Sequence, residues 1–164
     1  MKSTLPDIGA LPKKIENVQC WMTVGDEAPK LVDSTSNLVV YDAQEMIVSA
    51  IVSSLTGQTD GFITKYKAGA TVNPKAPASD DKGLEDQNPF EKNFIKSNIT
   101  ISGSQISFSL IMEKGEGNAN SGVKDYTELA LMSTNNKMFA RVLTTAPIPK
   151  DPNIRLEWKW TVGY

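Results

Sequence analysis

The sequence predicts a mainly β protein (α+β): an antiparallel β-sandwich with one flanking amphipathic helix and an extended N-terminal arm. The strongest evidence is a strict alternation near the C-terminus, where Ile154, Leu156, Trp158, Trp160 and Val162 share one face. Antiparallel sheets with one buried face show this pattern. Further strand-like segments separated by glycine- and asparagine-rich turns support the sandwich, and a single segment of helical period supports the helix.

The first 36 residues are expected to form the arm. Pro6, Pro12 and Pro29 interrupt this region, and its apolar runs show no helical period. Trp21 lies in one of these runs, and we expect it to dock on the body of the protein or on a neighbouring subunit. Deleting residues 1–25 should then weaken assembly and leave the fold intact. An ordinary first strand is the alternative interpretation. Residues 37–164 are predicted to form one β-sandwich domain.

The helix is expected at about 42–56. Asp42 is a candidate N-cap, and Glu45 follows at capping-box spacing. Apolar residues then recur at helical spacing, and Gly57 stands where a C-terminal glycine is expected. The apolar surface is wide, so we expect a sheet, and a partner as well, to cover the helix.

The remaining elements follow in order along the chain. The predicted strands are 62–67, 94–101, 106–112, 126–133, 138–145 and 154–162. Residues 69–92 are predicted to form a long loop, which is uncommon in a compact domain and often functional. Residues 115–122 form a polar loop, residues 134–137 a hairpin turn, and Pro147-Ile148-Pro149 breaks the strand pattern.

Composition excludes several classes of function. The chain of 164 residues has no histidine and one cysteine, which removes histidine-based catalysis, disulfides within the chain and cysteine-rich zinc sites. With 17 basic and 19 acidic residues, the net charge of −2 does not favour nucleic acid as a partner. No signal peptide or membrane-spanning segment is apparent, so we expect a protein made in the cytoplasm that does not bind membranes.

Motifs that could carry chemistry fail on their spacing. The glycine-rich segment 115–122 lacks the Lys-Ser/Thr and the following helix of a phosphate loop, so a hairpin loop is the better interpretation. The acidic residues Asp80, Asp81, Glu85 and Asp86 lack the spacing of a calcium loop. Trp158 and Trp160 could form a platform for sugars, but their shared face with Leu156 favours core packing. We therefore expect no enzyme, no catalytic residue, no cofactor, no metal and no small-molecule substrate.

The order of several short motifs resembles a known group of proteins. The motifs are Asn37-Leu38-Val39, Lys67-Ala68-Gly69, Leu84-Glu85, Tyr126-Thr127-Glu128-Leu129-Ala130-Leu131, Met138-Phe139-Ala140-Arg141, Pro147-Ile148-Pro149-Lys150 and Leu156-Glu157-Trp158-Lys159-Trp160. Together they resemble virion structural proteins of tailed bacteriophages, found among tail, baseplate and fibre-attachment components. The resemblance covers about residues 37–164. Ala130 departs from it by standing where glycine is common, and Thr144-Thr145-Ala146 replaces a more aromatic run.

The resemblance implies a structural component of a virion, assembled in the host cytoplasm. It would be a tail, neck or baseplate adaptor or attachment subunit that makes symmetric contacts with its own copies and with other virion proteins. A capsid decoration or head-fibre protein is the first alternative. A carbohydrate-binding module for host attachment is the second.

The residues expected to matter are structural and interfacial. Glu128 and Arg141 lie on adjacent strands of the predicted hairpin, where a direct ion pair is possible. Lys150 is expected to hold the proline turn. For interfaces with other proteins we predict Trp21 and the loop 74–90. The loop residues singled out are Pro74, Pro77, Asp80, Asp81 and Pro89.

Overall fold

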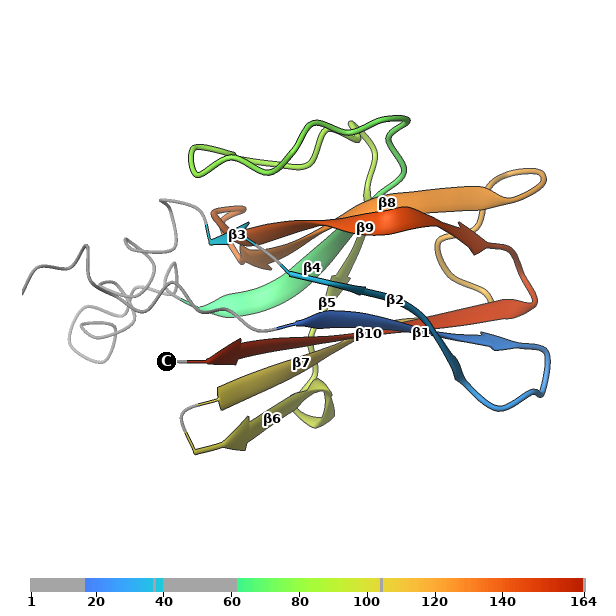
Figure 1. Ribbon diagram of the computed structural model, residues 1–164, viewed down its shortest axis with the longest axis horizontal. Coiled ribbons are helices and arrows are strands. Elements are labelled where there is room, and N and C mark those ends of the chain that lie inside the picture. Colours follow the sequence, from blue (N-terminus) through green and yellow to red (C-terminus); the bar gives the residue numbers. More distant parts are fainter. Residues whose placement is uncertain (1–16, 37, 40–61, 104, 164) are drawn as a thin grey trace, which may run out of the picture.

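Two antiparallel sheets pack face to face in the computed structural model, which describes residues 17–36, 38–39, 62–103 and 105–163 (Figure 1). Sheet A has the strand order β2-β1-β10-β7-β6. Its strands are β1 (Val18–Val24), β2 (Lys30–Thr35), β6 (Ile99–Ser102), β7 (Gln105–Met112) and β10 (Ile154–Gly163). Sheet B has the order β3-β9-β8-β4-β5. Its strands are β3 (Leu38–Val39), β4 (Ile63–Gly69), β5 (Phe90–Asn93), β8 (Lys124–Ser133) and β9 (Met138–Lys150). The predicted mainly β, antiparallel class is confirmed.

The core lies between the two sheets, and β10 contributes its largest side chains. Trp158 and Trp160 are 1% and 0% exposed, and the other apolar residues of the alternating strand are buried with them. Across the core, Tyr126 of sheet B meets Trp158 edge-on, with ring centroids 6.3 Å apart. Core packing of both tryptophans is therefore confirmed, and neither can form a surface platform for sugars.

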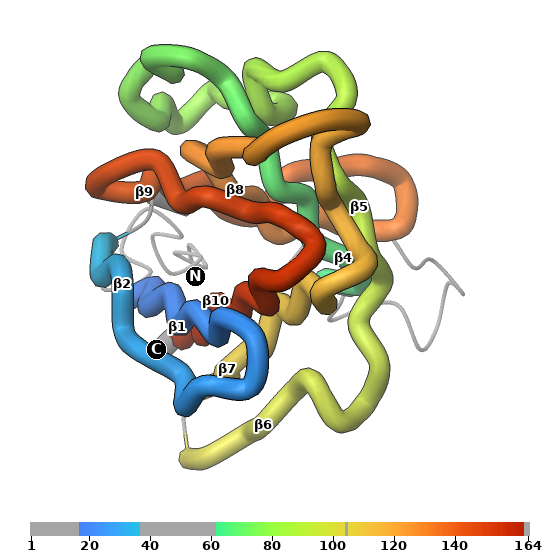
Figure 2. The backbone as a smooth tube through the Cα atoms, turned by 90° about the vertical axis from the view of Figure 1, so that its right-hand side faces the viewer, coloured from blue at the N-terminus to red at the C-terminus, as the bar shows by residue number. Residues whose placement is uncertain are grey.

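Strand β8 is buried on both of its faces. Tyr126, Leu129 and Leu131 belong to the main core between the sheets. Ala130 and Met132 form a second, smaller cluster, against which Leu84 of the long loop packs. The loop, residues 70–89, runs over the outer side of sheet B and makes a third layer there (Figure 2).

Residues 18–35 belong to the sandwich, so the prediction of an extended arm over residues 1–36 is wrong for this part. Strand β1 pairs with β10 on one side and with β2 on the other. Val18 and Cys20 are 2% and 1% exposed in the core. The reason is the period of two in this run, which turns Val18, Cys20 and Met22 toward the core. Residues 1–16 lie outside the described part, but deleting 1–25 would remove a core strand, so we now expect that deletion to unfold the protein.

Two further differences concern local elements. The strand expected at 94–101 is interrupted by a 3-10 turn, η2 (Lys96–Asn98), and only β6 continues as strand. Strand β9 continues through Pro147 and Pro149, where a break was expected. Within the described residues, β3 pairs with β9 only at Arg141 and Ala140, so the proline segment has strand β8 on one side alone. Proline is tolerated at such an edge because one side needs no amide donor. The predicted helix at 42–56 lies outside the described residues.

Candidate functional site

The two residues expected to pair, Glu128 and Arg141, are in direct contact on the outer side of sheet B. Strand β8 carries Glu128 and strand β9 carries Arg141, whose Cα partner is Ala130, two residues farther along β8. The Arg141 Nη2 donates to Glu128 Oε2 at 2.8 Å, and its Nε donates to the same oxygen at 3.2 Å. The two residues are 0% and 1% exposed, so this is a buried ion pair.

The same carboxylate binds the long loop that covers it. Glu128 Oε1 accepts hydrogen bonds from the Thr71 hydroxyl at 2.9 Å and from the Asp86 amide at 2.9 Å. Its Oε2 accepts from the Glu85 amide at 3.2 Å. One buried carboxylate therefore holds both ends of the loop against the sheet.

The guanidinium binds the middle of the loop. Arg141 Nη1 donates to Asp81 Oδ2 at 2.9 Å, and Nη2 lies 3.9 Å from Glu85 Oε1. Burial lowers the pKa of Arg141, but hydrogen bonds to Asp81 and Glu128 outweigh it and raise the pKa above its ordinary value. The cation is therefore held in the charged form. We call Glu128, Arg141 and Asp81 the loop clamp.

Gly69 is part of this arrangement, although its role was not predicted. It ends β4 directly beside Glu128, and a Cβ built on it would lie 2.7 Å from Glu128 Oε1. A side chain at this position would therefore push the carboxylate away from its partners. The glycine was visible in the Lys67-Ala68-Gly69 motif, but only the fold shows what approaches it.

The acidic cluster of the loop stabilises the loop itself. Asp86 accepts from the Ala70 amide at 2.9 Å and from the Asn88 amide at 2.8 Å, and Glu85 accepts from the Lys75 amide at 3.1 Å. Within the described residues, no group of three or more His, Cys, Asp or Glu side chains is arranged to hold a metal ion. These carboxylates act as acceptors for backbone amides.

The loop residues predicted to lie at an interface are exposed to different degrees. Asp80 is exposed, while Pro74, Pro77 and Pro89 are half-buried. The Asp81 carboxylate is bound to Arg141 within the chain. The solvent-facing surface of the loop therefore consists mainly of the residues that lie between these half-buried or bound positions.

Lys150, at the end of β9, was expected to hold the proline turn, but its side chain binds the loop between β7 and β8 and the residue that follows it. Lys150 is 0% exposed. Its ammonium donates to Asn118 Oδ1 at 2.6 Å and to the carbonyl oxygens of Lys114 and Asp151 at 3.1 and 2.9 Å. Burial lowers the pKa of Lys150, against the opposing effect of nearby carboxylates that begin with Asp151. Lys150 thus fastens the polar loop 113–123 to the end of the sandwich.

Trp21 lies on the opposite side of the molecule from the loop clamp. It is half-buried on the outer face of sheet A, and the Lys159 Nζ lies 5.9 Å from its ring centroid. Because the long loop covers the outer face of sheet B, Trp21 and that loop cannot belong to one continuous contact surface.

Comparisons with family models, with curated proteins and with solved structures gave no match for this chain. Among the residues that the structure describes, no helix has the length and apolar character needed to cross a bilayer.

Proposed function

We propose that this chain is a non-enzymatic structural subunit of a bacteriophage virion, in the tail, neck or baseplate. It would act there as an adaptor or attachment subunit through contacts with its own copies and with other virion proteins. The proposal rests on the resemblance over residues 37–164 and on one structural observation, the loop clamp.

The loop clamp turns a long irregular segment into an ordered outer layer. Part of the cost of binding through a loop is the entropy lost when the loop becomes ordered, and this loop is already held by a buried carboxylate and a buried guanidinium. Its outward side carries Val72, which is 87% exposed, and the exposed Lys75 and Asp80. Such a pre-organised surface suits a repeated protein–protein contact.

The chemistry of the clamp supports a structural role over a catalytic one. Glu128 and Arg141 are almost completely buried, and each is bound to several groups of the same chain. A catalytic acid or base must reach its substrate. These two side chains instead bind the covering loop.

The native mass in solution tests the self-assembly part of the proposal. Light scattering after size exclusion, over a range of concentrations, is expected to show a closed oligomer that Val72→Asp dissociates. Val123→Asp is the matched control, because Val123 is also exposed (54%) but lies in the loop between β7 and β8. A wild-type protein that stays monomeric, or an oligomer equally sensitive to both substitutions, would contradict a contact through the clamped loop.

The position in the particle is tested by immunoelectron microscopy. An antibody raised against the purified chain is applied to particles of the phage whose genome encodes it. Label on the tail, neck or baseplate supports the proposal. Label on the capsid surface would support the decoration or head-fibre alternative, and unlabelled particles would contradict a virion role.

A further inference from the structure

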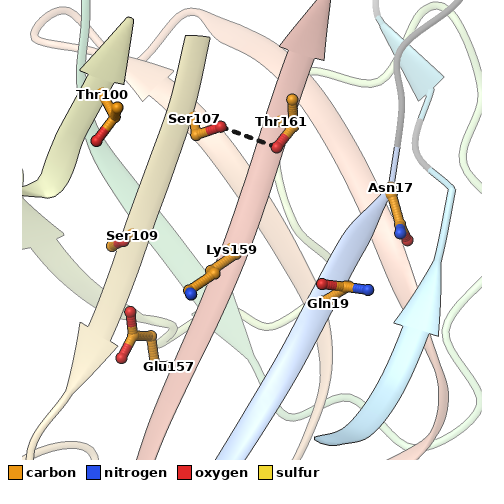
Figure 3. A pocket seen from close by; sticks show the side chains of 8 residues that line it. All are labelled: Asn17, Gln19, Thr100, Ser107, Ser109, Glu157, Lys159 and Thr161. Atoms are coloured by element: carbon orange, nitrogen blue, oxygen red, sulfur yellow. Dashed lines mark hydrogen bonds between the residues drawn. The ribbon is translucent and has the colours of Figure 1, made fainter. Parts of the chain in front are cut away.

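We propose that the outer face of sheet A binds a neutral oligosaccharide. This inference is independent of the virion role, and it assigns a place on the molecule and a ligand class to the carbohydrate-binding alternative that the sequence left open. It rests on a groove of about 440 Å³ formed by side chains of β1, β10, β7 and β6 (Figure 3). This volume lies within the range of about 300–1,000 Å³ that is typical of small-molecule sites.

The strand register places the polar side chains of the groove in two rows across the sheet. In the first row Gln19 of β1 pairs with Lys159 of β10, and Lys159 pairs with Ser109 of β7. The second row runs from Thr161 of β10 through Ser107 of β7 to Thr100 of β6. Directly opposed residues on one face of a sheet have Cβ atoms about 4.5–5.5 Å apart. The side chains of both rows therefore lie beside one another on one face of the sheet, as Figure 3 shows.

The chemistry of these side chains matches a polyhydroxylated ligand. Amides and hydroxyls both donate and accept hydrogen bonds, as the hydroxyl groups of a sugar require. Ser107 and Thr161 are already bonded to each other at 3.0 Å. Within the described residues, the side chains of Gln19, Thr100 and Ser109 make no hydrogen bond, so their donors and acceptors are available to a ligand.

Charge in the groove argues against a phosphate or another anionic ligand. The lining contains one carboxylate, Glu157, and one ammonium, Lys159. Arg155 Nη1 donates to Glu157 Oε2 at 3.0 Å, so this carboxylate is already paired with a residue that belongs to neither row. Anion sites gather several cationic or backbone donors. One lysine among neutral amides and hydroxyls does not provide them, and none of the described residues that line the groove is a large apolar residue that could hold a lipid.

Trp21 borders the groove and provides a reporter of binding. It pairs across the sheet with Glu157, one step beyond the first row, and the Lys159 ammonium lies beside its ring. The other tryptophans, Trp158 and Trp160, are buried in the core. A ligand that contacts Lys159 is therefore expected to change the emission of Trp21.

The test is a binding screen with the full chain. The probes are a glycan array and, in solution, neutral hexasaccharides of glucose, mannose, galactose and N-acetylglucosamine, with sulfated and sialylated glycans for comparison. We expect at least one neutral probe to bind and to change the tryptophan fluorescence. The double variant Gln19→Ala/Ser109→Ala should weaken that binding about tenfold or more, because it removes hydrogen-bonding groups from the first row.

Two further variants complete the test. Thr23→Ala is the matched control, since Thr23 lies on β1 beyond Trp21 and does not line the groove, so it should leave the affinity unchanged. Thr100→Tyr should abolish binding by filling the groove, and thermal melting checks that each variant is folded. The absence of binding to every neutral probe, a preference for anionic glycans, or equal affinity of wild type and groove variants would overturn the proposal.

Discussion

Removal of the Glu128 carboxylate is the sharpest test of the loop clamp. In Glu128→Ala the buried guanidinium of Arg141 loses the oxygen that it contacts at 2.8 and 3.2 Å. The loop at the same time loses its acceptor for the Thr71 hydroxyl and for two backbone amides. The substitution therefore leaves one buried charge with fewer partners and frees the covering loop.

The expected loss of stability is about 3 kcal/mol. Breaking a buried ion pair by removing one partner costs roughly 3–5 kcal/mol, because a buried charge is left uncompensated. Asp81 remains 2.9 Å from Arg141 and its side chain is 22% exposed, so part of the compensation and some access to water persist. This places the loss at the lower end of the range. For a domain of this size, it corresponds to a fall in Tm of about 6–12 °C.

Urea unfolding followed by tryptophan fluorescence measures the loss. Glu113→Ala is the control, because Glu113 also pairs with an arginine, Arg155 at 3.3 Å, but its side chain is 53% exposed. We expect the control to lose less than about 1 kcal/mol. Limited trypsin digestion at the exposed Lys75 should also be faster in Glu128→Ala than in either the control or the wild type, because the loop is no longer held.

A second variant separates the charge from the packing. Glu128→Met/Arg141→Met removes both charges and is expected to be more stable than Glu128→Ala, since apolar replacements of a buried pair are often close to neutral. The reasoning would be refuted if Glu128→Ala were as stable as the control. It would also be refuted if Lys75 stayed equally resistant to trypsin, because the carboxylate would then not hold the loop.

Three further predictions concern other parts of the fold. Burial raises the pKa of Glu91, but hydrogen bonds from Lys65 and Lys67 outweigh it and lower that pKa below 4.5. The stabilising contribution of Glu91 is therefore present above this value and is lost as the pH falls through the lowered pKa. Urea unfolding at pH values between 6 and 3 should show a shallower loss of stability for Glu91→Gln than for wild type. Lys150→Met removes the ammonium from three part-buried oxygen acceptors, of which the Lys114 and Asp151 carbonyls keep a second donor and Asn118 Oδ1 loses the donor described above. Chemical denaturation should therefore show a loss of about 1–3 kcal/mol, and a variant as stable as wild type would contradict the role assigned to this lysine. Gly117→Ala should lower Tm by several degrees, since the residue has a φ of +63° and the added Cβ would lie 2.4 Å from the sulfur of a core methionine; an unchanged Tm would show that the loop adapts.

The alternation of side chains made most of the sandwich predictable. Strands β7, β8 and β10 follow the expected boundaries closely, because a period of two with one apolar face has few other solutions. The contact between Glu128 and Arg141 could also be predicted from the sequence, because the turn at 134–137 brings their strands together. Local pattern was sufficient wherever the partner lay on the next strand along the chain.

The early residues show where that reasoning failed. The prolines and the lack of a helical period suggested an arm, although the run from Val18 to Val24 already alternates. Its partner, β10, lies more than a hundred residues away in the sequence. The pattern of residues 18–24 alone does not show that β10 has an unpaired edge on which this segment can form a strand.

The sequence by itself determined the class of this protein, its main strands and the paired charges on one hairpin, because these depend on periodicity and on short turns. Only the tertiary structure decided what covers those charges. Glu128 binds Thr71 and Asp86 across more than forty residues of intervening chain. The polar rows on sheet A arise in the same way, because β1, β10 and β7 lie far apart in the sequence and become neighbours only in the folded sheet. Such contacts follow from strand order and register, which the free energy of the whole core sets and no single segment encodes.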